Sequence, residues 1–465
     1  MLTRKQILSK MLIMVGCLMF VPLMLLIVYS DELKYGINFV IPGCISIVLG
    51  LMVPKIFRRL LSNKQTVVFV WLWGFFIATL PFYLNGGLNF VQALFESVSG
   101  FTTTGLSLLD VEKLPHIYLF YRAFLQYVGG IGFVMMILLF IDEKDAVSLY
   151  YAEGHPDKLM PSIFKTAKII CLMYLGLLVF GVTGYMMLGM NWLDAVVHAM
   201  CALSTGGFSN RLSSIGYYQS VPIEFFTVIL MLAGTTNFSL LLMLFRGKIR
   251  NFFASSEIRF MLGILAVFIP LLSVALFVNG FDINDSLRFG FFNVFSALST
   301  TGYCVGDYLR FGEQALFILI LLMLIGGGMG STAGGIKLAR VTKVCKYIVN
   351  NIESRFASSR KISLIYYNNG KDKEVLERKD IDEALTYMLS YLMIFIVGTL
   401  LLNSCSRSSL LYSAFEFASA LGTVGLSIGV TSMSLCNAGL IIEIAGMLLG
   451  RLEIFVIFEA FIKRN

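Results

Sequence analysis

The hydrophobic positions of this chain lie in long blocks that are separated by short polar segments. Apolar runs of roughly 20 residues recur along the whole length, and a helix of that length crosses a ~30 Å hydrocarbon core. The pattern therefore predicts an all-α polytopic membrane protein, and the even number of runs predicts both termini on one side. The ten predicted spans are 11–29, 37–54, 66–84, 117–141, 164–189, 221–245, 258–279, 313–336, 383–402 and 434–461.

Composition and charge agree with a membrane protein and indicate its orientation. Of the 465 residues, 57% are hydrophobic and only 14% are charged, against about 25% charged residues in soluble domains. The formal charge of +8 comes from Lys and Arg in short loops, which indicates topology rather than nucleic-acid binding. Eleven of these residues lie in 337–382, so this face and both termini are predicted to be cytoplasmic. The eight cysteines have no metal-ligand spacing.

The N-terminal apolar run is longer than the core of a usual signal peptide, and we expect an uncleaved first span. Four loops on the opposite face contain apolar stretches too short to cross, which are typical of re-entrant helices. These stretches are 90–101, 192–203, 287–298 and 410–421.

A short polar phrase follows each re-entrant stretch and precedes a full span. The four copies read ALFESVSGFTTTGLS, AVVHAMCALSTGGFS, GFFNVFSALSTTGYC and SAFEFASALGTVGLS. A threonine recurs in them, a glycine recurs two residues later, and the ninth residue before that glycine is always polar. The threonines are Thr103, Thr205, Thr300 and Thr423; the glycines are Gly105, Gly207, Gly302 and Gly425; the polar residues are Glu96, His198, Asn293 and Glu416.

All four units enter and leave the membrane in the same sense, so rotation about the membrane normal can relate them around a central pore. Non-helical backbone at membrane depth is tolerated where it lines a cavity or is buried in protein. A ring of carbonyl oxygens can replace the hydration shell of a monovalent cation, and glycine permits the positive φ that turns carbonyls toward the axis. The phrases are therefore predicted to form a selectivity filter, with glycine-rich turns as the alternative. Its residues would be Thr103, Thr104, Gly105, Thr205, Gly206, Gly207, Thr300, Thr301, Gly302, Thr423, Val424 and Gly425.

These phrases resemble the filter sequences of the Trk/Ktr/HKT superfamily of potassium transporters. GGGMGSTAGGIKLAR (326–340), YRAFLQYVGGIGF (121–133) and GRLEIF (450–455) resemble Trk-type members, as do two extra spans before the first unit. The fourth phrase, GTVGLS, resembles the Ktr branch more than the Trk branch. The resemblance covers essentially the whole chain. It implies a potassium uptake subunit in which glycine at position 105 goes with potassium selectivity.

The segment 326–337, called here the glycine-rich segment, is expected to interrupt the predicted span 313–336. Each glycine in a helix interior costs ~1 kcal/mol relative to alanine. The resemblance implies a gating loop beneath the filter, whereas a close helix-packing patch is the alternative. The segment does not match a phosphate-binding P-loop. The predicted gating residues are Gly326, Gly327, Gly328, Gly330, Ser331, Thr332, Gly334, Gly335 and Lys337.

Arg451 lies deep in the last span, where a charge normally faces a cavity or a partner. The resemblance implies a cation on the pore wall, and the alternative is an ion pair with Glu443, Glu453 or another carboxylate. Glu96 and Glu416 are predicted to anchor the short helices, and His198 to be a structural histidine.

The predicted organisation is two extra N-terminal transmembrane helices (1–62), four pore repeats, and a cytoplasmic loop. The repeats are 63–150, 151–250, 251–345 (with the gating loop) and 383–465, and the cytoplasmic loop is 346–382. The resemblance implies a homodimer in the bacterial inner membrane, with a cytosolic nucleotide-binding regulatory subunit. K⁺ would be the substrate, and no cofactor is expected. The alternatives are a sodium-coupled or sodium-permeable cation transporter and, with less support because the repeats are parallel, an organic-solute transporter. No catalytic motif supports an enzyme.

Overall fold

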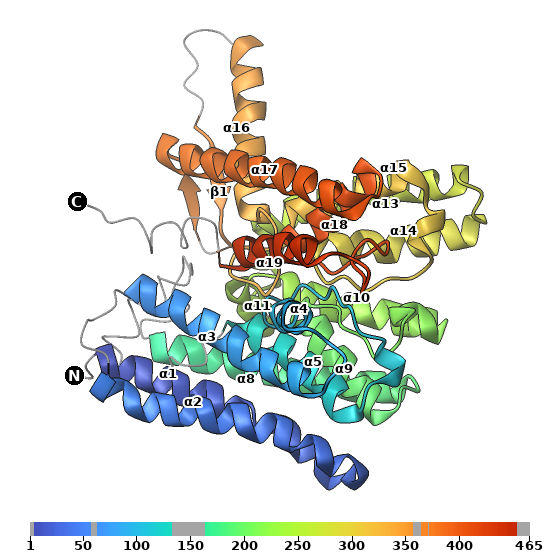
Figure 1. Cartoon of the computed structure of the whole chain (residues 1–465). Coiled ribbons are helices and arrows are strands. Elements are labelled where there is room, and N and C mark those ends of the chain that lie inside the picture. Colours follow the sequence, from blue (N-terminus) through green and yellow to red (C-terminus); the bar gives the residue numbers. More distant parts are fainter. Residues whose placement is uncertain (1–3, 57–62, 133–162, 357–363, 371, 453–465) are drawn as a thin grey trace.

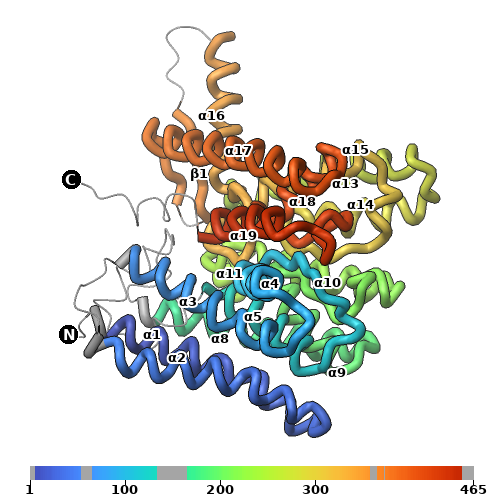
Figure 2. The backbone as a smooth tube through the Cα atoms, in the orientation of Figure 1, coloured from blue at the N-terminus to red at the C-terminus, as the bar shows by residue number. Residues whose placement is uncertain are grey.

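The computed structural model describes residues 4–56, 63–132, 163–356, 364–370 and 372–452. Within these ranges the regular secondary structure is helical apart from one small antiparallel hairpin of β1 (Tyr366–Asn368) and β2 (Lys373–Val375). The longest helices run in nearly one direction, and one helix, α16 (Leu338–Phe356), stands across them (Figures 1 and 2).

Apart from the first, the remaining long helices begin within five residues of the starts of the apolar runs, and several end before the runs do. They are α1 (Arg4–Leu18), α2 (Ile37–Ile56), α3 (Asn63–Leu84), α5 (His116–Ile131), α8 (Ile163–Met187), α10 (Val221–Thr235), α13 (Ser256–Val278), α15 (Gly312–Ile325), α17 (Arg378–Ser406) and α19 (Asn437–Arg451). Short helical segments join them: α11 (Phe238–Phe245), α12 (Ile249–Ala254), η1 (Val21–Ile27), η2 (Ser30–Tyr35), η3 (Val111–Lys113), η5 (Ser214–Tyr218) and η6 (Tyr308–Arg310).

Five helices in the described part are long and apolar enough to cross a membrane, or six if one bent pair counts as a single span. The molecule is therefore an all-helical membrane protein with several apolar spans. The predicted spans 117–141 and 434–461 both run past the described residues.

The four short apolar helices form where the sequence predicts them. They are α4 (Phe90–Phe101), α9 (Trp192–Leu203), α14 (Ile283–Leu298) and α18 (Leu410–Leu421). Each begins after a polar residue whose side chain accepts a backbone N–H of the first turn, which satisfies a donor that the helix leaves free. These N-cap residues are Asn89, Asn191, Asp282 and Ser409. The cap at Asp282 explains why the third helix begins four residues before the predicted 287.

Of three expectations about continuity, two need correction. The run 221–245 is two helices, α10 and α11, bent by 116° at a break. The break occurs because Asn237 caps α11 by accepting the N–H of Ser239, a local signal that the continuous hydropathy hides. The helix of the run 313–336 ends at Ile325, where the glycine-rich segment was predicted to interrupt it, so this prediction is confirmed. The segment 346–382, predicted as a loop, contains most of α16 and the hairpin.

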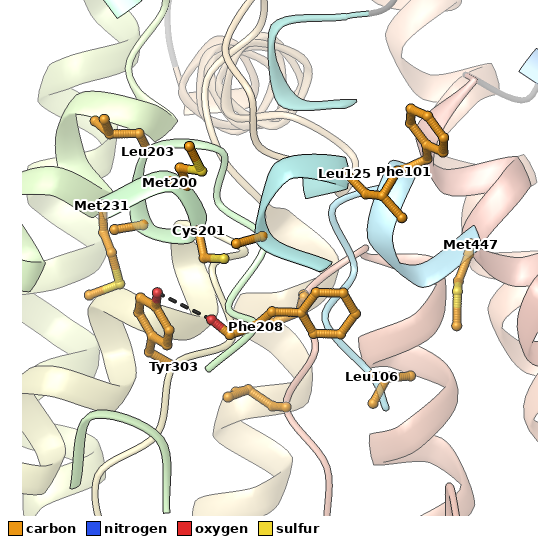
Figure 3. Close-up of a cluster of buried hydrophobic side chains, with 14 of the residues drawn as sticks. Phe101, Leu106, Leu125, Met200, Cys201, Leu203, Phe208, Met231, Tyr303 and Met447 are labelled. Carbon is orange, nitrogen blue, oxygen red and sulfur yellow. Dashed lines mark hydrogen bonds between the residues drawn. The ribbon is translucent and has the colours of Figure 1, made fainter. Parts of the chain in front are cut away.

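The core is continuous across the units rather than divided among them. Apolar side chains from different units pack around the loops that follow α4, α9 and α14 (Figure 3). Tyr303 is fully buried there, and its hydroxyl lies within hydrogen-bonding distance of the carbonyls of His198 (3.0 Å) and Phe208 (3.5 Å). A loop of one unit is thus fixed against the short helix of another.

Candidate functional site

Four loops with one backbone conformation follow the four short helices. Thr103, Thr205, Thr300 and Thr423 have φ of 56°, 52°, 54° and 50°. The glycine two residues later has positive φ in every loop, at 93° (Gly105), 72° (Gly207), 80° (Gly302) and 94° (Gly425). A β-branched residue rarely adopts the left-handed region, and such a residue costs of order 1–3 kcal/mol. Four strained threonines at equivalent positions indicate that the surrounding structure imposes this conformation.

The helix ends impose it through a repeated set of hydrogen bonds. In each loop the N–H of the residue after the threonine donates to the carbonyl of the residue five places earlier, at 2.8–3.0 Å. That carbonyl belongs to Ser99, Cys201, Ser296 or Ser419. In three loops the serine hydroxyl also bonds the loop: Ser99 with Gly105 N–H (3.1 Å) and Leu106 O (2.6 Å), Ser296 with Tyr303 O (2.5 Å), and Ser419 with Gly425 N–H (2.9 Å).

The four loops contact one another in a closed ring. A Cβ built on the glycine of any loop would lie less than 3.0 Å from a carbonyl oxygen of the next loop, so only glycine fits. The contacts run from the first loop to the second, third and fourth and back to the first. In ring order they are Gly105 to the Gly206 oxygen, Gly207 to Thr301, Gly302 to Val424 and Gly425 to Thr104.

Polar residues nine positions before each glycine hold the chain beyond the ring. All four side chains are fully buried. The Glu96 carboxylate accepts from Ser107 Oγ (2.9 Å) and Leu108 N–H (2.5 Å), and Glu416 accepts from Ser427 Oγ (2.5 Å) and Thr431 N–H (2.9 Å). His198 bonds Asp194 O (2.7 Å) and Ser209 Oγ (2.9 Å), and Asn293 donates to Val305 O (2.8 Å). These side chains therefore anchor the loop after the ring.

Charged and polar side chains also stabilise the short helices and the loops of the ring. Arg122 is 2% exposed, and its Nε lies 3.6 Å from Glu96 Oε2 while its guanidinium stacks on Phe208 at 4.0 Å. Arg211 pairs with Asp194 (2.8 Å) in the second unit. Gln126, on α5, donates from Nε2 to the Gly206 carbonyl (2.6 Å), which leaves that oxygen a second lone pair.

The glycine-rich segment lies against the threonines of three loops. Thr332 Oγ1 is 3.1 Å from Thr205 Oγ1, and Gly334 N–H donates to Thr300 Oγ1 (2.8 Å). A Cβ on Gly334 would collide with Thr423 Oγ1. The segment is also tied to the broken helix α10, because Thr332 Oγ1 lies 2.9 Å from Gly234 O and Gly328 N–H donates to Thr235 O (2.9 Å).

The other ties of this segment come from a carboxylate and from Arg451. Met329 N–H donates to Glu257 Oε1 (2.8 Å). Arg451 donates to Thr332 O (2.7 Å) and to the carbonyls of Gly129 and Gly130 at the end of α5. The arginine thus bonds backbone carbonyls, and Glu443 accepts from Thr431 (2.8 Å). Glu453, the other partner considered, lies outside the described residues.

Comparison with known proteins identifies the family. A family model described as TrkH, cation transport protein, matches residues 36–464. The chain belongs to this family.

Relatives and a solved structure agree with the family assignment over nearly the whole chain. The chain is 31% identical to the Trk system potassium uptake protein TrkH of Halomonas elongata, over 82% of this chain and 81% of the relative. It is 28% identical to TrkG of Escherichia coli (96% and 95%) and 29% identical to an uncharacterized cation transporter of Methanocaldococcus jannaschii (98% and 94%). The crystal structure of the potassium transporter TrkH from Vibrio parahaemolyticus matches with a TM-score of 0.85 at 26% identity, covering 99% of both chains.

Membership of the TrkH family confirms the predicted class, a cation transporter and not an enzyme. The structure brings the four predicted filter loops into one ring, and Thr332 and Gly334 of the predicted gating residues contact their threonines. Ser331 donates to Gly328 O within the segment. Lys337 turns back to donate to Ala333 O. Four further residues that hold the loops were not predicted: Ser99, Ser296, Ser419 and Gln126. The three serines share one offset, six residues before the glycine, and that recurrence would have revealed them.

Proposed function

We propose that this TrkH-family chain takes up K⁺ across the bacterial inner membrane through a filter made by the four loops. The observation that carries the proposal is the closed ring of four loops with matching φ values, in which each glycine packs on its neighbour's carbonyl. Carbonyls crowded around one axis can replace water around a monovalent cation. The potassium assignment is supported by the names of the Trk relatives and by glycine at position 105.

In this proposal the units 63–150, 151–250, 251–345 and 383–465 surround one pore, and 1–62 adds two outer helices. Both termini and 346–382 face the cytoplasm. A membrane potential of 100 mV supplies ~2.3 kcal/mol for each inward positive charge, so the potential or a coupled ion drives uptake. Arg451 adds a cation to the pore wall just below the ring.

The glycine-rich segment (326–337) acts as the gate. Its contacts with Thr205, Thr300 and Thr423 support this role, as do its hydrogen bonds to α10 and Arg451. A cytosolic nucleotide-binding subunit acting on a homodimer would move it, as in Trk systems.

Cation flux into proteoliposomes tests the proposal. We expect K⁺ and Rb⁺ to enter faster than Na⁺, and Gly105→Ser to weaken this discrimination because the added side chain collides with the Gly206 carbonyl. Gly263→Ala is the matched control, since a Cβ there meets nothing within 4 Å. The proposal fails if no alkali cation enters even when residues 326–330 are deleted, or if Na⁺ enters as fast as K⁺ in the native protein.

A further inference from the structure

A cavity of about 810 Å³ lies where α13, α16 and the β-hairpin meet, away from the ring. Ser256 at the first turn of α13 and Asn368 of β1 contribute polar groups to its wall. Cavities of this size are typical of sites for small molecules. The proposed pathway for cations through the ring does not explain this cavity.

Three basic side chains from three different elements line this cavity: Arg259 of α13, Lys346 of α16 and Lys373 of β2. Among the described residues, Glu353 is the one carboxylate that lines it. Lys346 Nζ donates to Ser256 Oγ (2.8 Å) and to Tyr366 O (2.7 Å), which uses two of its three N–H groups. The ammonium group is therefore held in place with a donor remaining.

The electrostatics of the cavity favour an anion. Desolvation, together with the charges of Arg259 and Lys373, lowers the pKa of Lys346 below its ordinary value. A bound anion would offset this repulsion and would favour the charged ammonium form.

The rest of the wall and the position of α16 indicate that the ligand has an apolar part. Phe260, Val349 and Leu364 line the cavity beside the basic groups. Helix α16 stands across the long helices (Figure 1) and exposes Ile348 and Ile352, at 48% and 53%. An amphipathic helix in this orientation lies along a membrane surface, with its basic side chains at the depth of the headgroups.

We propose that this cavity binds the phosphate group of an anionic ligand between Arg259, Lys346 and Lys373. Two sources carry this chemistry, the headgroup of an anionic phospholipid and a free phosphate compound, and the apolar wall favours the lipid. This inference rests on the proposed function in one respect: the cytoplasmic location of 346–382 assigns the lipid to the cytoplasmic leaflet.

Two binding measurements on the purified, delipidated full chain distinguish the sources. Native mass spectrometry compares retention of phosphatidylglycerol with that of phosphatidylcholine, and thermal unfolding in detergent is followed during titration with inorganic phosphate. The test variant is Arg259→Gln/Lys346→Gln, and the control is Lys379→Gln, whose side chain is 81% exposed on α17. Loss of two charge-assisted contacts should weaken binding at least about tenfold, and the control should bind like the native chain.

A phosphatidylglycerol preference that only the double variant loses supports the proposal with a lipid ligand. A phosphate-dependent rise in the unfolding temperature that only the double variant loses supports it with a free ligand. Equal binding by the native chain and the double variant in both measurements overturns it. Should the double variant unfold without ligand, Lys373→Gln on the exposed strand β2 replaces it. Neither measurement involves cation flux, so failure here is distinct from failure of the proposed transport.

Discussion

Thr332→Val should open the gate. The Thr332 hydroxyl lies 3.0 Å from Leu203 O, 2.9 Å from Gly234 O and 3.1 Å from Thr205 Oγ1. A hydroxyl has one proton, so it donates to one carbonyl at a time, and either hydroxyl of the Thr332–Thr205 pair can be the donor between them. Valine keeps the shape and removes about two hydrogen bonds, each worth about 0.5–1.5 kcal/mol net.

The closed state should therefore lose about 1–3 kcal/mol, which shifts the ratio of open to closed gates by about 5- to 150-fold. The bonds made by the Thr332 backbone, to Gly234 O and from Arg451, remain. Open probability in planar bilayers, measured without any partner subunit, reports the shift directly.

The matched control is Thr235→Val, at the same contact between the segment and α10. The Thr235 hydroxyl has no hydrogen-bond partner among the described residues, so its removal should leave the open probability unchanged. An open probability for Thr332→Val at or below the native value, with the protein folded, would refute the assignment of 326–337 as a gate.

Two further substitutions test the frame around the ring. Arg122→Ala leaves Glu96 as a buried carboxylate without its cation and should lower the free energy of unfolding by about 3–5 kcal/mol. A thermal unfolding midpoint in detergent equal to the native one would contradict this. Gly302→Ala should reduce K⁺ flux at least about tenfold, because its Cβ would collide with the Val424 carbonyl at a φ of 80°, whereas Gly176→Ala, which meets nothing within 4 Å, should transport normally.

The short helices could be predicted from the sequence because length, polarity and caps agree there. Phe90–Phe101 and Leu410–Leu421 begin and end where the apolar stretches do. The recurring threonine and glycine likewise predicted which residues the structure brings together. These predictions use only the length of apolar stretches, the capping residues and the repeated positions, all of which can be read from the amino-acid sequence.

The details that the sequence could not predict depend on contacts between distant segments. Propensity argues against left-handed Thr103 and Thr300, and the hydrogen bonds to the helix ends override it. The sequence placed Arg451 deep in the last span, but it could not predict that Thr332 and the end of α5 present backbone carbonyls to its guanidinium. The break between α10 and α11 is set by one capping asparagine inside a continuous apolar run, so hydropathy does not reveal it.

The central claim is that the ring of four loops binds the transported cation. The most direct measurement is anomalous X-ray diffraction from crystals grown with Rb⁺ in place of K⁺. The account predicts a Rb⁺ peak on the axis of the ring, at the level of Thr103, Thr205, Thr300 and Thr423, and loss of that peak when Na⁺ replaces Rb⁺. An ordered ring without a peak on its axis, or Rb⁺ bound only elsewhere in the molecule, would contradict it.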